Sequence, residues 1–569
     1  MVVRPAPEAP PNDRPRVDIR AKVTGAATYI EDVPELPGTA YAVAIRSPYS
    51  HARIVSIDTS RARGLPGVLA VLDPESLKEY DLHIPSHLPT DAVGVPDHFI
   101  TTDRARYDGD LVGMVVAEDL RTARTAAGLV DVEWEILKPL FSADESLAPD
   151  AESIHEEVGS NVALTDSLEW GDVEQGFNES DYIFEGTFIS PTIFHHPIEP
   201  STSVVANYTS DGIEMWTSTS SPFSVLKKVA DIFGISPEQV RVHVPYIGGH
   251  FGGKHSGAEL LTTAVLSMKT GRPVSYRASE NDSFRMAARE ASAFKARIGA
   301  KRDGTPVALD VELTMDTGGY FSCARIFTGN AVTSSYGGYR VPNFRVRATT
   351  AYSNKVPVTT FRNTGKNQTA FGIDAAMEAV ARHLGVSPIE FRARNLLHRG
   401  ETIPALNWKR DGKASAARIP LMDTDYGELL EQAVAAIGWD GRTHGPIPVA
   451  GSPRLVRGRG ISASVRRGSA VGSATARASL DGQGVVTIHH NAPDVGEGAH
   501  TVISLVAAVT LGISQDQVRV GQPDTANGLH FSGTTSQRVT VQMGNAVRNA
   551  CELLKQELRD AASQAYGAA

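Results

Sequence analysis

The chain has 569 residues, a formal net charge of −10 and a hydrophobic content of 41%. This length exceeds what one hydrophobic core supports, so several domains are expected. The sequence has no long basic run and no apolar run of about 18 residues, which argues against a nucleic-acid partner and a membrane-spanning helix. It also lacks an apolar signal peptide at its start, so we expect a cytoplasmic protein. With only Cys323 and Cys551, an iron–sulfur cluster or a cysteine zinc site on this chain is not expected.

The first part of the chain predicts a flexible arm and a small α+β domain. Residues 1–15 are rich in proline and are expected to form the arm. The domain is expected over residues 16–142. Its predicted elements are strands at 27–33, 40–48, 52–58, 111–117 and 130–136, with a helix that ends near Gly128.

Two larger units are expected after this domain. Residues 143–180 are rich in Asp, Glu, Ser and Asn and are predicted to be a connector, followed by domains over 181–425 and 426–569. Within the first of these, Ser221 suits a helix N-cap and Pro222 the first helical position, while Gly234 ends the apolar helix.

One phrase of the sequence recurs. The run Phe-Gly-Ile-Ser-Pro-Glu-Gln-Val-Arg-Val at 233–242 returns as Leu-Gly-Ile-Ser-Gln-Asp-Gln-Val-Arg-Val at 511–520, with a looser form at 384–392. Two related α/β units would explain the repetition. Helices that end at glycine for local reasons, without common ancestry, would explain it equally well.

A glycine-rich loop joins a strand that starts at Val240 to an apolar helix. The loop reads Gly-Gly-His-Phe-Gly-Gly-Lys at 248–254. Its glycines let the backbone approach a ligand, and consecutive N–H groups before a helix suit phosphate or a metal-oxo group, although such loops also occur for structural reasons. The spacing is one residue from a P-loop, but His255 stands where Ser or Thr would hold magnesium. A dinucleotide fingerprint is missing its first glycine, at Ile247.

Three further loops lead into predicted helices. Residues 361–368 carry amide and cationic side chains between a strand ending at 360 and a helix over 369–384; the others are 494–501 and 532–540. Each is suited to anionic oxygen but is also compatible with a solvated helix cap. Together the four loops could surround one large polyanionic ligand.

In this order, the loops resemble the molybdopterin-binding subunit of the xanthine oxidase and aldehyde oxidase family of molybdenum hydroxylases. The resemblance extends over essentially the whole chain. It includes the segments 25–29, 46–54, 196–200, 248–254, 271–274, 362–368 and 392–396. It implies an α+β fold with a small hammerhead-like N-terminal domain and elongated molybdopterin-binding domains, the last of them incomplete.

The resemblance also implies the chemistry. Molybdenum would be held by the pterin dithiolene and not by a protein side chain, and an N-heterocycle or aldehyde would be oxidised with water as the oxygen source. The nucleotide form of the cofactor stays open between the mononucleotide and a dinucleotide such as the cytosine form. By position, Gly249, Phe251 and Gly252 would face the metal-oxo group and Arg362 the cofactor. The other cofactor-binding positions are Gly496, Glu497, Ser536, Gln537, Arg538 and Thr540.

Several positions depart from the family pattern. The substrate-pocket positions are Ser220, His255, Asn330, Asn363 and Thr364. His255 replaces a substrate-binding glutamate of the purine enzymes, and Thr364 replaces an aromatic residue that would stack on a flat substrate, so xanthine is not expected. Asn363 replaces the cysteine of the carbon monoxide dehydrogenase branch, so a copper–molybdenum site is not expected.

Two changes within the cofactor motifs leave an alternative open. His250 replaces a usual glycine, and Glu497 replaces a usual glutamine. A non-catalytic scaffold that has lost cofactor binding would fit these changes.

The family's catalytic glutamate lies on a Gly-Val-Gly-Glu type motif well beyond the position of residue 540, and no such motif follows residue 540 here. Some relatives, such as the nicotinate dehydrogenase type, divide the molybdenum portion between two polypeptides. We therefore expect the base on a second molybdopterin-domain subunit, with [2Fe-2S] and FAD subunits completing the enzyme.

Overall fold

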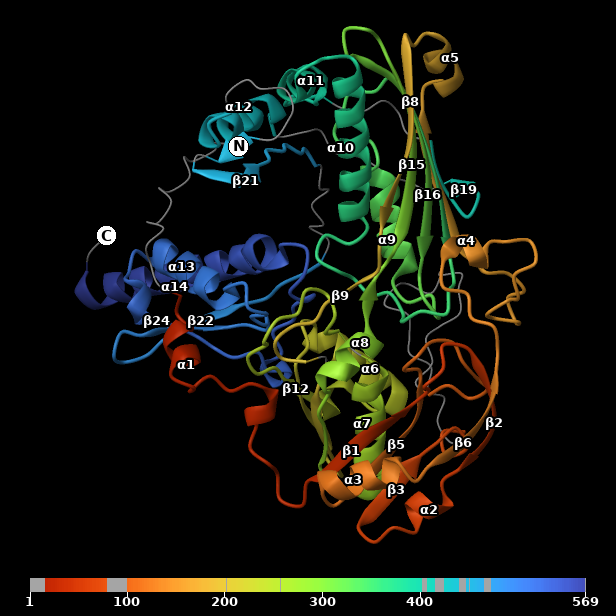
Figure 1. The fold of residues 1–569 in the computed structure, drawn as a ribbon. Helices are drawn as coiled ribbons and strands as arrows, with labels where there is room; N and C mark the ends of the chain where they lie inside the picture. Colours follow the sequence, from red (N-terminus) through yellow and green to blue (C-terminus); the bar gives the residue numbers. More distant parts are fainter. Residues whose placement is uncertain are drawn as a thin grey trace.

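The fold was analysed in a computed structural model, shown in Figure 1. The structure describes residues 16–78, 100–200, 202–255, 257–401, 407–414, 424–439, 447–449, 451–464 and 472–567. The predicted arm at 1–15 lies outside these residues. Three buried hydrophobic clusters organise the fold, one for each of its larger sheets and one for the C-terminal unit.

The first sheet combines strands from two predicted domains. Its strand order is β12 (Val240–His243), β11 (Gly212–Thr217), β10 (Val204–Thr209), β13 (Val274–Tyr276), β1 (Ala40–Arg46), β5 (Leu111–Ala117) and β3 (Val68–Leu72). Strand β5 is buried along its whole length, which explains its uninterrupted apolar sequence. Helices α6 (Pro222–Phe233) and α7 (Ala258–Thr270) pack against this sheet.

The second sheet stands apart from the first in Figure 1. Its order is β19 (Lys413–Ala414), β18 (Asn407–Arg410), β7 (Val162–Trp170), β17 (Asn343–Ala351), β16 (Pro306–Asp316), β15 (Ser292–Ala300) and β8 (Tyr182–Ser190). Helices α9 (Ala324–Ser334) and α10 (Lys366–His383) pack against it.

The C-terminal unit has a three-stranded sheet, β22 (Arg477–Leu480), β23 (Val486–His489) and β24 (Val518–Val520). Helices α13 (Ala499–Leu511) and α14 (Gly544–Tyr566) cover it, and the π-helical turn η5 (Val539–Met543) precedes α14. The remaining elements are α1 (Ile19–Val23), η1 (Ile30–Asp32), β2 (Ala52–Asp58), α2 (Ser60–Arg63), β4 (Arg104–Ala105), α3 (Leu120–Ala127), β6 (Asp131–Ile136), α4 (Ala143–Ser146), α5 (Val173–Asn178), β9 (Ile193–Phe194), η2 (Pro237–Gln239), α8 (Glu280–Met286), β14 (Ala288–Arg289), α11 (Pro388–Asn395), α12 (Tyr426–Ala436), β20 (Ile447–Val449), β21 (Ser452–Arg457), η3 (Gln515–Gln517) and η4 (Thr525–Asn527).

The repeated phrase occupies the same place in two similar units. Helix α6 ends at Gly234 and α13 at Gly512, both in the left-handed conformation. In each unit a short 3₁₀ turn closed by a capping box follows, and then a strand parallel to its neighbour, β12 beside β11 and β24 beside β23. The looser form differs, because α10 is followed by helix α11 and not by a strand.

The structure differs from the sequence predictions at four places. The predicted strand at 27–33 contains the 3₁₀ turn η1, and the predicted strand ending at 360 forms a single bridge at Val358 next to Pro357. Helix α10 begins at Lys366 and not at residue 369. Within the predicted connector 143–180, β7 pairs inside the second sheet, where its alternate residues are buried. The domain limits themselves stay predictions.

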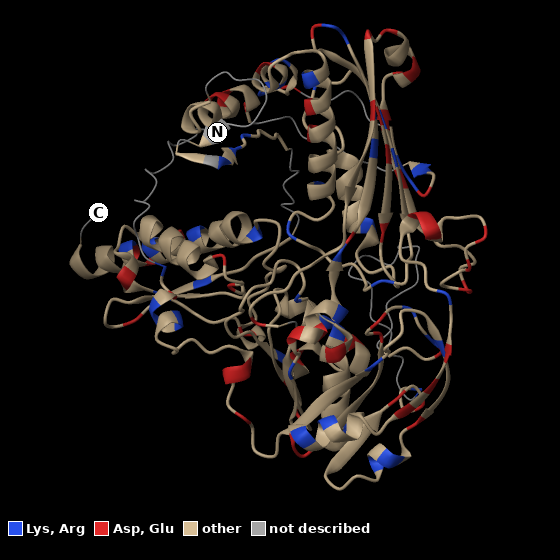
Figure 2. Cartoon of the chain, viewed as in Figure 1, with Lys and Arg blue, Asp and Glu red and all other residues tan. Residues whose placement is uncertain are grey.

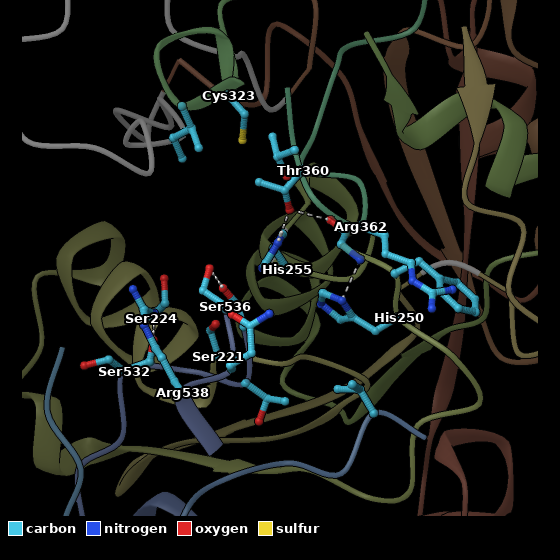
Figure 3. A pocket seen from close by; sticks show the side chains of 18 of the residues that line it. Ser221, Ser224, His250, His255, Cys323, Thr360, Arg362, Ser532, Ser536 and Arg538 are labelled. Atoms are coloured by element: carbon cyan, nitrogen blue, oxygen red, sulfur yellow. Dashed lines mark hydrogen bonds between the residues drawn. The ribbon is translucent and has the colours of Figure 1, made fainter. Parts of the chain in front are cut away.

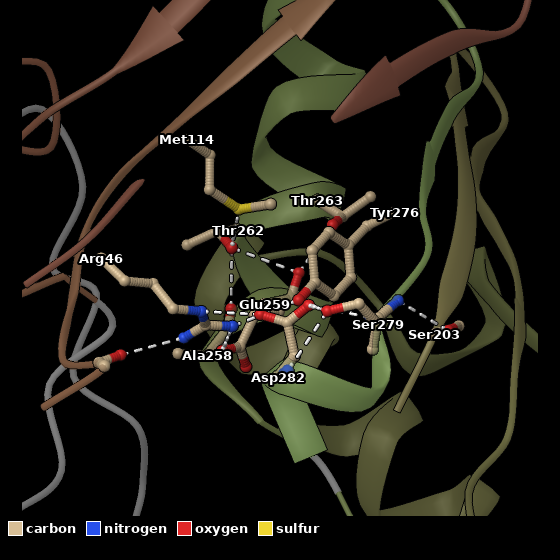
Figure 4. Close-up of polar contacts among 12 residues, drawn as sticks. Arg46, Met114, Ser203, Ala258, Glu259, Thr262, Thr263, Tyr276, Ser279 and Asp282 are labelled. Atoms are coloured by element: carbon tan, nitrogen blue, oxygen red, sulfur yellow. Dashed lines mark hydrogen bonds and ion pairs between the residues drawn. The ribbon is translucent and has the colours of Figure 1, made fainter. Parts of the chain in front are cut away.

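A buried ionic cluster anchors the helix that follows the glycine-rich loop (Figure 4). Arg46 on β1 donates to Glu259 on α7 at 2.8 Å and to Asp282 on α8 at 2.9 Å. The side chains of Arg46 and Glu259 are 7% and 6% exposed. Since opposite charges buried together hold each other strongly, the start of α7 is fixed relative to the first sheet.

Acidic and basic residues are interspersed over the elements in Figure 2. None of the helices in the described residues is both long and apolar enough to cross a membrane.

Candidate functional site

The four loops line one pocket with a volume of about 1070 Å³ (Figure 3). This is slightly above the range of about 300–1,000 Å³ that is typical of small-molecule sites. The lining residues are Ser221, Phe223, Ser224, Val225, Lys227, Gly249, His250, Phe251, Gly252, His255, Cys323, Ile326, Asn330, Thr360, Arg362, Asn363, Thr364, Lys366, Val495, Gly496, Glu497, His530, Phe531, Ser532, Thr534, Thr535, Ser536, Gln537 and Arg538.

The glycine-rich loop forms one wall because its backbone passes close to other segments. Gly252 has φ 111°, and a Cβ there would lie 2.0 Å from the Thr360 carbonyl oxygen. Phe251 has φ 50° and an exposed ring. The main-chain N–H groups of Gly249, His250 and Phe251 have no acceptor among the described residues. These donors are therefore available to an anionic ligand.

His250 folds beneath the loop. Its Nδ1 accepts a hydrogen bond from the Gly252 N–H at 2.8 Å, and its ring packs edge-on against His255. Burial holds the pKa of His250 well below its usual value and lowers that of His255 to about 4, so both rings are neutral at pH 7. His250 therefore supports the loop from below without adding a positive charge to the pocket.

Lys254, at the end of the loop, does not line the pocket. Its ammonium group lies 2.5 Å from Glu199 Oε2, and the two side chains are 1% and 10% exposed. The same oxygen accepts from the Gly248 N–H at 2.9 Å. A P-loop lysine would instead face the phosphates of a nucleotide, so the P-loop alternative is wrong.

The second loop, at 361–366, is held from below by a buried carboxylate. Glu290 Oε1 accepts from the Gly365 N–H at 2.9 Å and from Gln368 Nε2 at 2.8 Å. Burial raises the pKa of Glu290 to about 7. The loop is also tied to the first one, since the Arg362 N–H donates to the Phe251 carbonyl at 2.8 Å. The Arg362 guanidinium is exposed and has no hydrogen-bond partner among the described residues.

Asp494 shapes the third loop. Its Oδ1 accepts from the N–H groups of Gly496 and Gly498, and its Oδ2 from that of His500. Glu497 Oε2 accepts from the Val495 N–H at 2.9 Å. Burial by the surrounding protein, together with the charge of Asp494, raises the pKa of Glu497 to about 7.

The fourth loop closes the pocket and joins the two similar units. The Thr534 N–H donates to the Ser220 carbonyl at 2.9 Å, while a Cβ at Gly533 would lie 2.3 Å from Ser221 Oγ. Ser536 and Gln537 have φ 51° and 58°. Their main-chain N–H groups also have no acceptor among the described residues. The loop leads into the π-helical turn η5, a feature that is frequent at functional sites.

Strained backbone is concentrated at this pocket. Among the described residues that are not glycine and have positive φ, four line it: Phe251, Asn363, Ser536 and Gln537. Such conformations cost roughly 1–3 kcal/mol each and are typical of binding sites.

The charge of the lining favours an anion. Its cationic side chains are Lys227, Arg362, Lys366 and Arg538, and its one carboxylate among the described residues is Glu497. Since the pKa of Glu497 is about 7, this carboxyl group is only partly ionised at neutral pH.

The structure brings together all but two of the predicted site residues. Ser220 lies behind the lining, and its hydroxyl oxygen is 3.4 Å from His255 Nδ1. Thr540 lies in η5 and is exposed outside the pocket. Both sit next to lining segments.

Sequence reasoning missed one end of the pocket. It is formed by Phe223, Ser224 and Lys227 from α6, which face Ser532 and His530 of the fourth loop. The Ser221-Pro222 helix start was the available signal, because a helix N-terminus suits an anion. By itself this motif predicts only a helix boundary.

Comparisons with known proteins cover most of the chain. Residues 24–138 match the model described as "Aldehyde oxidase and xanthine dehydrogenase, a/b hammerhead domain". Residues 154–396 and 432–569 match two models of a molybdopterin cofactor-binding domain.

Individual proteins give the same result. The chain is 31% identical to a xanthine dehydrogenase molybdenum-binding subunit of Escherichia coli O157:H7, over 95% of this chain and 71% of that protein. It is 30% identical to the nicotinate dehydrogenase large molybdopterin subunit of Eubacterium barkeri, over 75% of this chain and 96% of that protein. The structure of an aldehyde oxidoreductase from Desulfovibrio gigas superposes with a TM-score of 0.79 at 26% identity, over 95% of this chain and 59% of that one.

Proposed function

The chain belongs to the xanthine oxidase and aldehyde oxidoreductase family of molybdenum hydroxylases, as a molybdopterin-binding subunit, and from this premise we propose how its pocket works. The four loops hold the molybdopterin cofactor. When bound, the cofactor supplies the two-electron redox chemistry that hydroxylates an N-heterocycle or oxidises an aldehyde, with water as the oxygen source.

One observation carries this proposal: main-chain donors without acceptors among the described residues line the pocket from two separate loops. They are the N–H groups of Gly249, His250 and Phe251 in the first loop and of Ser536 and Gln537 in the fourth. A cofactor rich in oxo and phosphate oxygens would accept these hydrogen bonds. The residues present therefore fit the group, and the changes at His250 and Glu497 do not fill the space.

Individual residues take the roles that their positions suggest. Gly249 and Phe251 would donate toward the metal-oxo side, whereas the Gly252 N–H already donates to His250 Nδ1. The guanidinium of Arg362 would bind an anionic oxygen of the cofactor. Gly496 and Glu497 would contact the pterin. Ser536, Gln537 and Arg538 would bind its phosphate.

We assign the end of the pocket near α6 to the nucleotide of a dinucleotide cofactor such as the cytosine form. The rings of Phe223 and His530 lie 5.0 Å apart there and offer aromatic surface to a base. Lys227 and Arg538 supply positive charge for a second phosphate.

The side chains assigned to the substrate side are polar and uncharged. Asn330 Nδ2 donates to the Thr364 carbonyl at 3.2 Å, and Asn363 Oδ1 is buried without a donor. His255 donates its Nε2–H toward Thr360 Oγ1 at 2.9 Å, a direction that follows because this hydroxyl donates to the Gly252 carbonyl. With His255 and Thr364 in place of a carboxylate and an aromatic ring, this side favours an aldehyde or an N-heterocycle other than xanthine.

The general base would come from a second molybdopterin-domain subunit, with [2Fe-2S] and FAD subunits as electron acceptors. Glu497 is the one carboxylate in the described lining, and it hydrogen-bonds the Val495 N–H. The name of the nicotinate dehydrogenase relative as a large molybdopterin subunit supports a further subunit of that kind. A cytoplasmic location also stays a prediction, supported by the scarcity of cysteine.

The proposal is tested on the native complex, isolated through a tag on this chain. Molybdenum is measured by elemental analysis and the pterin by the fluorescence of its oxidised derivative. We expect about one of each per chain. The change Arg362→Gln should weaken cofactor retention about 10- to 100-fold, the loss of one charge-assisted hydrogen bond or two.

The control is Arg302→Gln, because Arg302 is exposed and lies outside the pocket. It should retain the cofactor as the unmodified chain does. A complete complex without molybdenum or pterin would overturn the proposal and favour the alternative of a non-catalytic scaffold.

A further inference from the structure

Residues 16–22 precede the first sheet in the chain, yet they lie against the C-terminal unit, and Figure 1 shows α1 just below it. Arg16 Nη1 donates to the Gly496 carbonyl at 2.9 Å, and the Val17 N–H donates to Thr501 Oγ1 at 3.2 Å. Gly496 belongs to the third loop of the pocket, and Thr501 stands in the first turn of α13. Two contacts therefore hold this loop from outside, since neither Arg16 nor Val17 lines the pocket.

A buried acid sets the direction of the Arg16 guanidinium. Asp18 accepts from Arg16 Nε at 2.9 Å and from Nη2 at 2.7 Å, the two-pronged geometry that a planar guanidinium favours. The Asp18 side chain is only 1% exposed, and Lys22 Nζ pairs with it at 2.5 Å. With Nε and Nη2 engaged in this way, Nη1 is directed at the Gly496 carbonyl.

The third loop needs such support because its own backbone is intrinsically flexible. Gly496 and Gly498 have φ 108° and 90°, a region that glycine adopts without a side chain to restrict it. A Cβ at Gly496 would meet no atom within 4 Å, so packing does little to hold this residue. Its hydrogen bonds among the described residues are two: Asp494 accepts from its N–H, and Arg16 donates to its carbonyl.

The bond to Arg16 also orients the neighbouring peptide group. The C=O and N–H groups of a trans peptide point in opposite directions, and no cis peptide occurs among the described residues. Because the Gly496 carbonyl points to Arg16, outside the lining, the Glu497 N–H points the other way. Arg16 therefore fixes the plane of the peptide between two residues that line the pocket.

The same segment of the chain reaches the first loop. Lys22 Nζ lies 5.1 Å from the centre of the Tyr246 ring, and the Tyr246 N–H donates to the Thr28 carbonyl at 3.0 Å. Tyr246 stands two residues before Gly248, where the glycine-rich loop begins. Residues 16–28 thus connect the first and third loops without lining the pocket themselves.

We propose that Arg16 is a positioning residue for the cofactor: it holds the peptide between Gly496 and Glu497 in the orientation that the pterin requires, without touching the ligand. This inference rests on the proposed function and deepens it. Burial and the charge of Asp494 raise the pKa of Glu497 to about 7, and the charge of Arg16 opposes this rise. Arg16 therefore acts on the loop through both geometry and charge, and experiment can separate the two.

Hydrogen–deuterium exchange of the purified full chain tests the geometry without the cofactor. Arg16→Met keeps a long side chain but removes its N–H donors, so the amides of Gly496 and Gly498 should exchange about tenfold faster. The matched control is Arg20→Met, because Arg20 is exposed in α1 and its side chain has no hydrogen bond to the described residues. This control removes the same charge from the same segment and should leave the exchange unchanged. Circular dichroism checks that both variants fold.

Molybdenum retention in the native complex tests the two effects separately. At pH 6, where Glu497 is mostly protonated, Arg16→Met should retain the cofactor about tenfold more weakly, because its loop is no longer held. The fall of retention with pH should also move to higher pH, since the pKa of Glu497 rises without the charge of Arg16. Arg16→Lys keeps the charge but cannot bind Asp18 and Gly496 together, so it should restore the pH of the fall and not the full retention.

Each other outcome overturns the proposal. Unchanged exchange at the third loop in Arg16→Met would show that the loop holds itself. Faster exchange with unchanged molybdenum retention would show that the position of the loop does not matter to the cofactor. Equal losses in Arg16→Met and Arg20→Met would mean that the charge of the segment counts and not the bond to Gly496. A complex of the unmodified chain without molybdenum would refute the proposed function instead, and the exchange experiment would still decide whether Arg16 holds the loop.

Discussion

The ion pair between Lys254 and Glu199 provides the sharpest test of how the glycine-rich loop is held. The ammonium group lies 2.5 Å from a carboxylate oxygen that also accepts the Gly248 N–H, and both side chains are almost fully buried. One pair therefore fastens the first and last residues of the loop to the segment that contains Glu199. Burial lowers the pKa of Lys254 in spite of the attraction of Glu199. The ammonium group has therefore lost hydration, and the charge of Glu199 compensates for that loss.

Lys254→Met removes the cation and leaves Glu199 buried without its charge partner. Breaking a buried pair in this way costs about 3–5 kcal/mol. The double change Lys254→Met with Glu199→Gln removes both charges, while the glutamine oxygen can still accept the Gly248 N–H. It should therefore recover at least about half of the loss.

Urea unfolding of the purified chain, followed by tryptophan fluorescence, gives the order of stability. We expect the unmodified chain to be the most stable and Lys254→Met the least, with the double variant between them. Molybdenum content in the native complex should follow the same order, because the loop supplies cofactor donors. The reasoning would be refuted if Lys254→Met kept its unfolding midpoint but lost phosphate or cofactor binding, since Lys254 would then face the ligand.

Three further predictions concern the loops. Gly252→Ala forces a Cβ to within 2.0 Å of the Thr360 oxygen at positive φ, so it should destabilise the chain and lower molybdenum content. The control Gly385→Ala, at φ 69° in open space, should cost only about 1 kcal/mol of unfolding free energy. Equal urea unfolding midpoints for the two variants would contradict this prediction. Glu290 has its pKa raised from 4.5 to about 7 in the folded state, so the folded chain holds the extra proton and stability falls as pH rises from 4.5 to 7, by up to about 3 kcal/mol. Glu290→Gln should make this fall shallower in urea midpoints measured from pH 5 to 8, and an unchanged slope would count against it. The pKa of Glu497 is about 7, so its negative charge develops between pH 6 and 8. Molybdenum retention after dialysis should therefore drop over this range in the unmodified chain but not in Glu497→Gln. The control Glu557→Gln, at an exposed position, should behave as the unmodified chain.

The sequence predicted those helix and strand limits that depend on neighbouring residues. Ser221, Pro222 and Gly234 predicted the limits of α6 correctly, and the apolar run at Leu111–Ala117 predicted β5. These signals are local, because caps and strand patterning depend on residues a few positions apart. The strand predicted at 27–33 was wrong, since alternation over a few residues does not distinguish a strand from a short 3₁₀ turn.

The sequence did not predict the contacts between segments that are distant in the chain. The sequence singled out four loops and the family resemblance, and so most of the pocket residues. It could not show that Lys254 turns away to Glu199, that His250 folds beneath its loop, or that Ser220 and Thr540 fall outside the lining. The direction of each side chain depends on backbone dihedral angles and on packing partners far away in the chain. Only the tertiary structure fixes these dihedral angles and contacts.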